Sequence, residues 1–144
     1  GSGTRLGIGN DLMDGAREIK RITTLNRNAF SVYNQLYTSV LAHAREYDLV
    51  LISLGPTATV LAYDLSQQGI RCIDTGHIDI EYEWMRSAAR TKTEIAGKNV
   101  NEAGVLLSDD QHDTDEHYRG QILLHVGLPQ EPMVNGVILQ QPVV

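Results

Sequence analysis

The chain has 144 residues and a formal net charge of −6, which suggests one domain of ordinary size. The negative charge argues against a general affinity for nucleic-acid backbone or for an anionic membrane. No apolar stretch reaches the ~20 residues of a membrane span, and no signal peptide is visible. The single cysteine, Cys72, permits no intrachain disulfide, which fits a reducing, cytoplasmic compartment.

The N-terminal segment joins a short glycine–serine sequence to a glycine-rich loop. Residues 1–3 are typical of a cloning scar, so we expect a fragment of a longer protein whose natural start is hidden. Gly7 and Gly9, followed by Asn10 and Asp11, predict a tight loop that opens toward a ligand or a helix. The two polar side chains could bond a ribose, sugar or base, whereas a simple turn is the default interpretation.

A strand over residues 18–25 and a helix over residues 28–47 are predicted next. The strand prediction rests on the isoleucines and threonines of EIKRITTL. Asn28 is suited to cap the helix. The apolar face of the helix follows the helical period at Tyr33, Leu36, Tyr37, Val40, Leu41 and Ala44.

A strand–helix–strand unit is predicted in the middle of the chain. The nearly continuous apolar run over residues 48–54 is typical of a central parallel strand covered on both faces. Gly55 suits the N-cap of the following helix, Pro56 suits its first position, and Gly69 suits its end. Residues 70–74 predict a second buried strand, so the unit should form a right-handed crossover in a parallel sheet.

The turn at Gly55, Pro56 and Thr57 is a candidate phosphate site. A helix N-terminus presents unpaired N–H groups and about half a positive charge, and Thr57 adds a hydroxyl. The segment has no Walker lysine and no G-x-G-x-x-G spacing. A well-capped helix in an α/β sheet is therefore an equally good interpretation.

Acidic residues and a histidine gather directly after the second strand of this unit. Such a cluster at the carboxyl end of a strand is where an α/β protein usually builds its site. Asp79 and Glu81 have the D-x-E spacing that can hold a hard divalent cation beside a diphosphate. If the segment is extended, both carboxylates and His77 lie on the same side, and the two acids repel unless a cation separates them. The alternative is a solvated acidic loop.

The sequence signal weakens beyond Lys92. A short helix at residues 82–90, a short strand within residues 102–107 and a strand over residues 121–126 are predicted. Residues 108–116 predict a solvated acidic loop, because they lack the glycine and glutamate spacing of a calcium-binding hand. The remaining residues predict an extended or poorly ordered tail.

Together these segments resemble the glycosyltransferase GT-D domain family, formerly a domain of unknown function. The resemblance is carried by RLGIGNDLMDGA, NAFSVYNQL, LVLISLGPTATVLAYDLSQQGI and IDTGHIDIEYEW, and it covers about residues 4–102. It implies an α/β, Rossmann-like, mostly parallel sheet flanked by helices. Family domains are much longer, and their N-terminal half carries an arginine–glycine–acid motif that is absent here. The chain therefore resembles the C-terminal half, with residues 103–144 as an unplaced extension.

The resemblance implies a metal-dependent transferase. Its donor would be a nucleotide diphosphate sugar, expected to be UDP-glucose, and its acceptor a glycan or glycoprotein. The family motif places a divalent cation, Mn²⁺ or Mg²⁺, on Asp79 and Glu81. The segments that should line the donor pocket contribute Gly7, Gly9, Asn10, Asp11, Gly55, Pro56, Thr57 and His77.

Glu83 and Asp11 are the candidates for the general base that activates the acceptor hydroxyl. Two rival interpretations stay open at this point. One is a non-catalytic Rossmann-like module that binds a nucleotide or a partner protein, and the other is a phosphate-ester hydrolase that uses the same acidic cluster. The oligomeric state is also open, and a homo-oligomer is compatible with the sequence.

Overall fold

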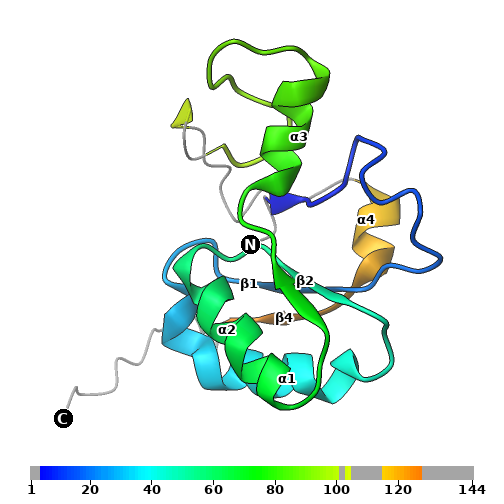
Figure 1. Cartoon of the computed structure of the whole chain (residues 1–144), viewed down its shortest axis with the longest axis vertical. Helices are drawn as coiled ribbons and strands as arrows, with labels where there is room; N and C mark the ends of the chain where they lie inside the picture. Colours follow the sequence, from blue (N-terminus) through cyan, green and yellow to red (C-terminus); the bar gives the residue numbers. More distant parts are fainter. Residues whose placement is uncertain (1–3, 101–102, 105–114, 128–144) are drawn as a thin grey trace, which may run out of the picture.

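Strands and helices alternate along the chain of the computed structural model, which describes residues 4–100, 103–104 and 115–127 (Figure 1). The elements are β1 (Arg21–Thr24), a 3-10 turn η2 (Ala29–Val32), α1 (Tyr33–Ala44), β2 (Val50–Ile52), α2 (Pro56–Gln67), β3 (Cys72–Asp74), α3 (Ile78–Arg86), α4 (Glu116–Gln121) and β4 (Ile122–Val126). The predicted α/β class, with parallel strands flanked by helices, is confirmed.

Both strand pairs in the described residues are parallel. Strand β2 pairs with β3, with Leu51 opposite Ile73. Strand β1 pairs with β4, with Thr24 opposite Val126. Because α2 connects β2 to β3, the predicted strand–helix–strand unit and its parallel pairing are confirmed.

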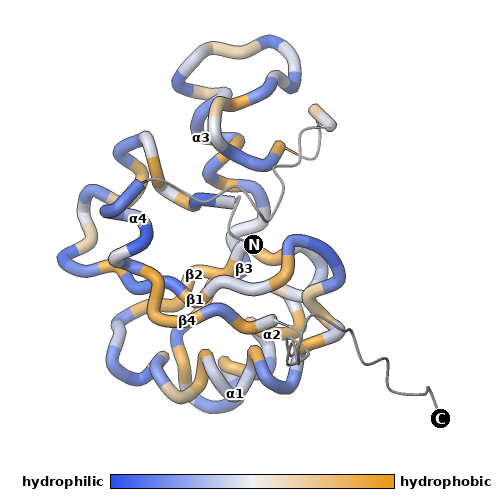
Figure 2. The backbone as a smooth tube through the Cα atoms, turned by 180° about the vertical axis from the view of Figure 1, so that it is seen from behind, coloured by the Kyte–Doolittle hydropathy of each residue, from blue (hydrophilic) through white to orange (hydrophobic). Residues whose placement is uncertain are grey.

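The main apolar core lies between the strands and helices α1 and α2, which lie together on one side of the strands (Figure 1). Figure 2 shows the hydrophobic stretches of the strands running through the centre of the molecule. The buried members of the main core are Val32, Leu36, Val40, Ala44, Ile52, Ala58, Leu61, Leu65, Ile70 and Val126. The predicted apolar face of α1 is confirmed, since its tyrosines and Leu41 pack at the margin of this core.

The start of α2 agrees with the prediction from the sequence, whereas the start of α1 differs from it. Gly55 is the N-cap of α2 with φ 55° and ψ −147°, a conformation that favours glycine, and Pro56 follows at the first position. Asn28 has φ 50°, and its side chain makes no cap hydrogen bond. Its carbonyl instead accepts hydrogen bonds from the N–H and hydroxyl of Ser31, at 3.0 and 2.8 Å. The prediction that the Asn28 side chain caps a helix was wrong, because a 3-10 turn comes before α1.

Strand β3 is less buried than the sequence predicted. Ile73 is 50% exposed, Asp74 is exposed and Cys72 is half-buried. Within the described residues β3 pairs only with β2, so it lies at the edge of its sheet and α2 covers it. The prediction of a second buried strand was therefore wrong.

The acidic segment after β3 is helical rather than extended. Helix α3 begins at Ile78, not near Tyr82, and it forms because Ile80 and Trp84 pack against Val100 on one helix face. Residues two apart on a helix point to different sides, so the extended, same-side arrangement of its first two acids was wrong. Acids in its first turn also interact favourably with the helix dipole.

The C-terminal part that the structure describes joins the fold. The strand predicted over residues 121–126 is confirmed as β4, which pairs with β1. Helix α4 begins after Asp115, whose carboxylate accepts the Tyr118 N–H at 3.1 Å. Residues 103 and 104 are described but form no strand, and the rest of the strand predicted within residues 102–107 lies outside the described residues. Most of the acidic loop and residues 128–144 of the tail also lie outside them. None of the described helices is both long enough and apolar enough to cross a membrane.

Candidate functional site

The carboxyl ends of β2 and β3 meet the start of α2 at one edge of the sheet. The Ile52 carbonyl accepts the Thr75 N–H at 2.9 Å and the Thr75 hydroxyl at 3.0 Å, which fixes the turn after β3. The Thr59 hydroxyl donates to one oxygen of Asp74 at 2.8 Å, and the Gly76 N–H donates to the other at 3.0 Å. An exposed carboxylate and an exposed hydroxyl are thus held together where an α/β fold usually binds its ligand.

The N-terminus of α2 gives this edge a partial positive charge. No acid lies in the first turn of α2, so the helix dipole there is not offset by a carboxylate of the helix itself. Thr57, predicted to add a hydroxyl, is only 7% exposed. Thr59, one half-turn further on, is the exposed hydroxyl at this helix start.

The glycine-rich loop contacts α3. The Gly7 N–H and the Asn10 Nδ2 both donate to Oδ1 of Asp79, each at 2.9 Å, and Asn10 Nδ2 also donates to Oε1 of Glu83 at 2.7 Å. Gly7 has φ 71°, and a Cβ atom there would overlap the Met13 side chain, so this position favours glycine twice over. The loop contacts a helix, as one of the expected arrangements has it, and its part in ligand binding stays a prediction.

A buried ion pair closes the other side of Asp79. Lys98 Nζ lies 2.6 Å from Oδ2 of Asp79 and 3.8 Å from Oε1 of Glu83. The Lys98 and Asp79 side chains are only 5% and 4% exposed. Every oxygen of the Asp79 carboxylate therefore has a partner from the protein.

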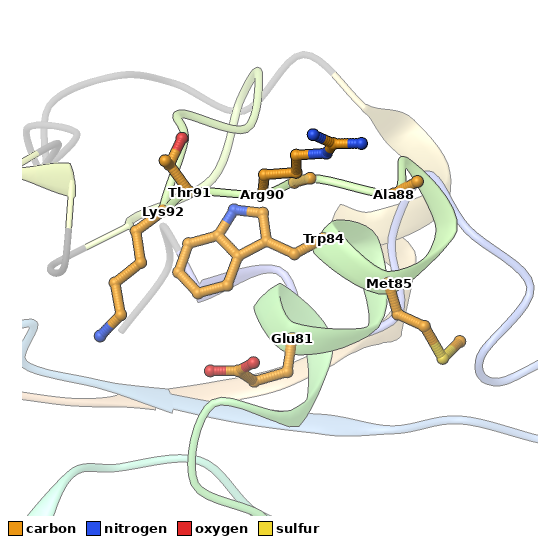
Figure 3. Close-up of a pocket in the computed structure, with 8 residues that line it drawn as sticks. Glu81, Trp84, Met85, Ala88, Arg90, Thr91 and Lys92 are labelled. Atoms are coloured by element: carbon orange, nitrogen blue, oxygen red, sulfur yellow. The ribbon is translucent and has the colours of Figure 1, made fainter.

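Glu81 lies elsewhere on α3 and lines a pocket of about 490 Å³ (Figure 3). Trp84 of α3 also lines it, as do Arg90 and Lys92 in the loop that follows α3. The indole N–H donates to the Thr93 carbonyl at 2.9 Å, which holds the ring in place. This pocket combines one acid and two cations around an aromatic ring.

The predicted metal ligands do not surround one position in this arrangement. Asp79 is buried with Lys98, Glu81 is exposed at the pocket, and His77 is exposed at the N-cap of α3. Within residues 4–100, 103–104 and 115–127, no group of three or more His, Cys, Asp or Glu side chains is placed to hold a metal. Metal binding by Asp79 and Glu81 stays a prediction.

The two candidate bases, Asp11 and Glu83, both lie where the glycine-rich loop meets α3. Asp11 accepts a hydrogen bond from the Tyr82 hydroxyl at 2.8 Å and lies 3.3 Å from Arg86. The Tyr82 hydrogen bond, followed by one from the backbone of Asp11 itself, lowers the pKa of Asp11, and the charge of Arg86 adds to this. A lowered pKa makes the Asp11 carboxylate a weaker base.

Sequence reasoning missed Lys98 and Thr59. Lys98 is 19 residues from its partner Asp79, in a segment without periodicity, so no local signal marks it. Thr59 follows Thr57 by two positions, and helical geometry alone indicates that both cannot face the core.

Comparisons with known proteins show which family this chain is similar to. A family model described as the glycosyltransferase GT-D fold matches residues 1–103. "Probable glycosyl transferase Gly" of Streptococcus gordonii is 44% identical over 85% of this chain, and glycosyltransferase GlyD of Streptococcus pneumoniae serotype 4 (strain ATCC BAA-334 / TIGR4) is 41% identical over 88% of it. This chain spans only 18% and 15% of those two relatives.

Solved structures also resemble this chain. One, described as the domain of unknown function 1792 with a distinct glycosyltransferase fold, is 37% identical with a TM-score of 0.75, over 87% of this chain and 44% of its own. Another, described as a new glycosyltransferase from Streptococcus sanguinis, is 42% identical with a TM-score of 0.76, over 86% of this chain and 46% of its own. The chain therefore belongs to the glycosyltransferase GT-D fold family.

Proposed function

We propose that this chain forms the donor-binding part of a glycosyltransferase. The longer protein would transfer a sugar from a nucleotide diphosphate donor, UDP-glucose in our proposal, to a hydroxyl of a glycan or glycoprotein. The observation that carries this proposal is the match to a glycosyltransferase family model over residues 1–103. The 37% and 42% identity to solved chains of that description supports it.

The proposed donor site is the edge formed by β2, β3 and the start of α2. An acidic chain needs a local positive field to hold a diphosphate, and the N-terminus of α2 supplies one. Asp74 and Thr59 are held together there at 2.8 Å and are exposed, so they can bond ribose or sugar hydroxyls. This is the arrangement expected at the carboxyl ends of parallel strands.

The proposed base is Glu83, with Asp11 as the second candidate. A base is needed to take the proton of the acceptor hydroxyl while the bond between the sugar carbon and the diphosphate oxygen breaks. Asn10 fixes one oxygen of Glu83 at 2.7 Å, and the side chain is 22% exposed, so it is both oriented and accessible. No step of this proposal passes through a metal ion, because Asp79 and Glu81 do not surround one position in this arrangement.

Donor binding can be tested on this chain by nuclear magnetic resonance titration with UDP-glucose and UDP. We expect amide signals of residues 55–59 and 74–77 to shift. Thr59→Val should weaken binding by about three- to tenfold, which corresponds to one hydrogen bond. Thr38→Val is the matched control, because the Thr38 hydroxyl bonds only its own helix at the Asn34 carbonyl in α1.

Two results would contradict the proposed donor site. One is unchanged affinity in Thr59→Val. The other is a set of shifts confined to the pocket around Trp84, which would place the nucleotide at α3 instead.

The rival function is a non-catalytic binding module. The chain spans only part of its relatives, and this observation is compatible with that function. The chain covers less than half of the solved chains that it resembles, so a site completed by other parts of the protein is compatible with it. Release of UDP from UDP-glucose by the whole protein separates the two functions. A transferase releases UDP faster when acceptor is present, whereas a binding module releases none.

A further inference from the structure

On α3, the acid that lies beside Asp79 is Glu83, not Glu81. They are one helical turn apart, so their side chains lie on the same helix face. Asn10 Nδ2 bridges them, at 2.9 Å to Asp79 Oδ1 and 2.7 Å to Glu83 Oε1. Lys98 Nζ lies beside both, at 2.6 and 3.8 Å. A cationic group therefore already occupies the space between the two carboxylates.

Burial makes this ammonium group necessary. Asp79 and Lys98 are 4% and 5% exposed, and a buried charge is tolerated only when it is paired and hydrogen-bonded. Gly7 and Asn10 complete the hydrogen bonds of Asp79. A single carboxylate thus joins three segments: the glycine-rich loop, α3 and the loop that carries Lys98.

We propose that the Lys98 ammonium is the resident cation of the Asp79–Glu83 centre, and that Asp79 is a positioning residue which does not ligate a divalent ion. Asp79 then holds the glycine-rich loop against α3, and through Asn10 it sets the orientation of Glu83. Glu81, exposed on another side of α3, takes no part in this centre. The proposal goes beyond the proposed function and does not depend on the donor or the acceptor.

A divalent ion would have to displace this arrangement in order to bind Asp79. Mg²⁺, Mn²⁺ and Ca²⁺ need carboxylate oxygens as direct ligands, and both oxygens of Asp79 already accept protein hydrogen bonds. A metal ion beside Oδ2 would also face the positive charge of Lys98 at close range. Two cations at one carboxylate repel strongly in a partly buried site.

The proposal is tested by calorimetric titration of Mn²⁺ into four forms: wild type, Asp79→Asn, Lys98→Met and the double variant. We expect equal Mn²⁺ affinity in wild type and Asp79→Asn. Lys98→Met should bind Mn²⁺ about tenfold more tightly or better, because it removes the competing charge, and the double variant should lose this gain. A purely structural lysine would not produce the gain. Lys92→Met, at the exposed Lys92, is the matched control and should change nothing.

A second measurement needs no variant and decides the question if Asp79→Asn does not fold. Lysine acetylation of wild type is followed by mass spectrometry with and without saturating Mn²⁺. We expect Lys98 to stay protected in both conditions, whereas exposed Lys92 reacts in both. Exposure of Lys98 by Mn²⁺, or a tenfold loss of Mn²⁺ affinity in folded Asp79→Asn, overturns the proposal. Neither measurement uses a nucleotide, so their outcome is separate from that of the proposed function.

Discussion

The sheet region and the α3 region of this molecule are held together in different ways. The sheet region consists of the strands with α1 and α2, and its core is apolar side chains drawn from helices and strands alike. The α3 region consists of α3, the glycine-rich loop and residues 87–100. Among the residues that the structure describes, its apolar cluster has three buried members, Ile80, Trp84 and Val100. Beside them lies the buried pair of Asp79 and Lys98.

The two regions therefore differ in what they contribute: the sheet region contributes mainly stability, and the α3 region positions side chains. Apolar packing is non-directional and tolerates substitutions of similar volume. The polar contacts of the α3 region are directional, and each links segments that are far apart in sequence. A side chain such as Glu83 can therefore be oriented closely in the α3 region, while the sheet region supplies most of the free energy of folding.

The largest expected effect comes from breaking the sheet region. Leu65→Ala removes a side chain with 0% exposure from the main core, and we expect a loss of about 4 kcal/mol in the free energy of unfolding. Val60→Ala on the exposed side of the same helix should cost about 0.5 kcal/mol or less. Urea unfolding followed by circular dichroism gives both values. Similar losses in the two variants would contradict the assignment of this core.

Breaking the α3 region at its ion pair is expected to have the next largest effect. Lys98→Met leaves the Asp79 carboxylate buried without its cation, which should cost about 3 kcal/mol. Urea unfolding measures this loss, and hydrogen exchange at the Gly7 amide locates it, because that N–H donates to Asp79. Lys20→Met is the control, since Lys20 makes only a surface pair with Glu18. Equal stability of the two variants would mean that the buried pair does not support the region.

The glycine-rich loop offers a smaller change that sharpens the comparison. Gly7→Ala meets both a backbone with φ 71° and the Met13 side chain, so we expect a loss of about 2 kcal/mol. Gly9→Ala meets only the unfavourable backbone conformation, with φ 78°, because no atom lies near its Cβ. It should lower the free energy of unfolding by about 1 kcal/mol. Thermal unfolding of the two variants compares them. A Gly9→Ala variant as unstable as Gly7→Ala would rule out the close approach to Met13.

The smallest expected effect is a change of pKa at the α3 surface. The Tyr82 hydrogen bond lowers the pKa of Asp11, so Tyr82→Phe should raise that pKa toward its ordinary value of about 3.9. Because the folded-state pKa lies below the unfolded one, the stability linked to Asp11 is fully present above the unfolded pKa. It is lost as pH falls through the folded pKa. Carboxyl carbon resonances measure the shift, and exposed Tyr63→Phe should leave Asp11 unchanged.

The sheet region could be predicted from sequence because its signals are local. The apolar spacing of α1, the continuous run of β2 and the Gly55–Pro56 start of α2 each depend on a few neighbouring residues. The edge position of β3 could not be predicted, because an apolar run does not reveal how many neighbours a strand has. Family resemblance added the fold and the class of reaction.

The α3 region could be predicted only in part. The sequence marked Asp79 and Glu83 as chemically important, but it did not show that they share one helix face, because the D-x-E segment was considered as an extended one. Metal binding by Asp79 and Glu81 stays a prediction. The packing of Trp84 against Val100 makes the segment helical, and that contact is not local. Lys98 has no sequence signal at all, since only the folded chain brings it to Asp79.

The most direct test of this account is a double-mutant cycle between Asp79 and Lys98. The free energy of unfolding is measured for wild type, Asp79→Asn, Lys98→Met and the double variant under identical conditions. If the pair joins the glycine-rich loop to α3, the double variant should be more stable than additivity predicts, by about 2 kcal/mol. Additive losses, with a coupling energy near zero, would contradict the claim that Lys98 is the cation on which the α3 region depends.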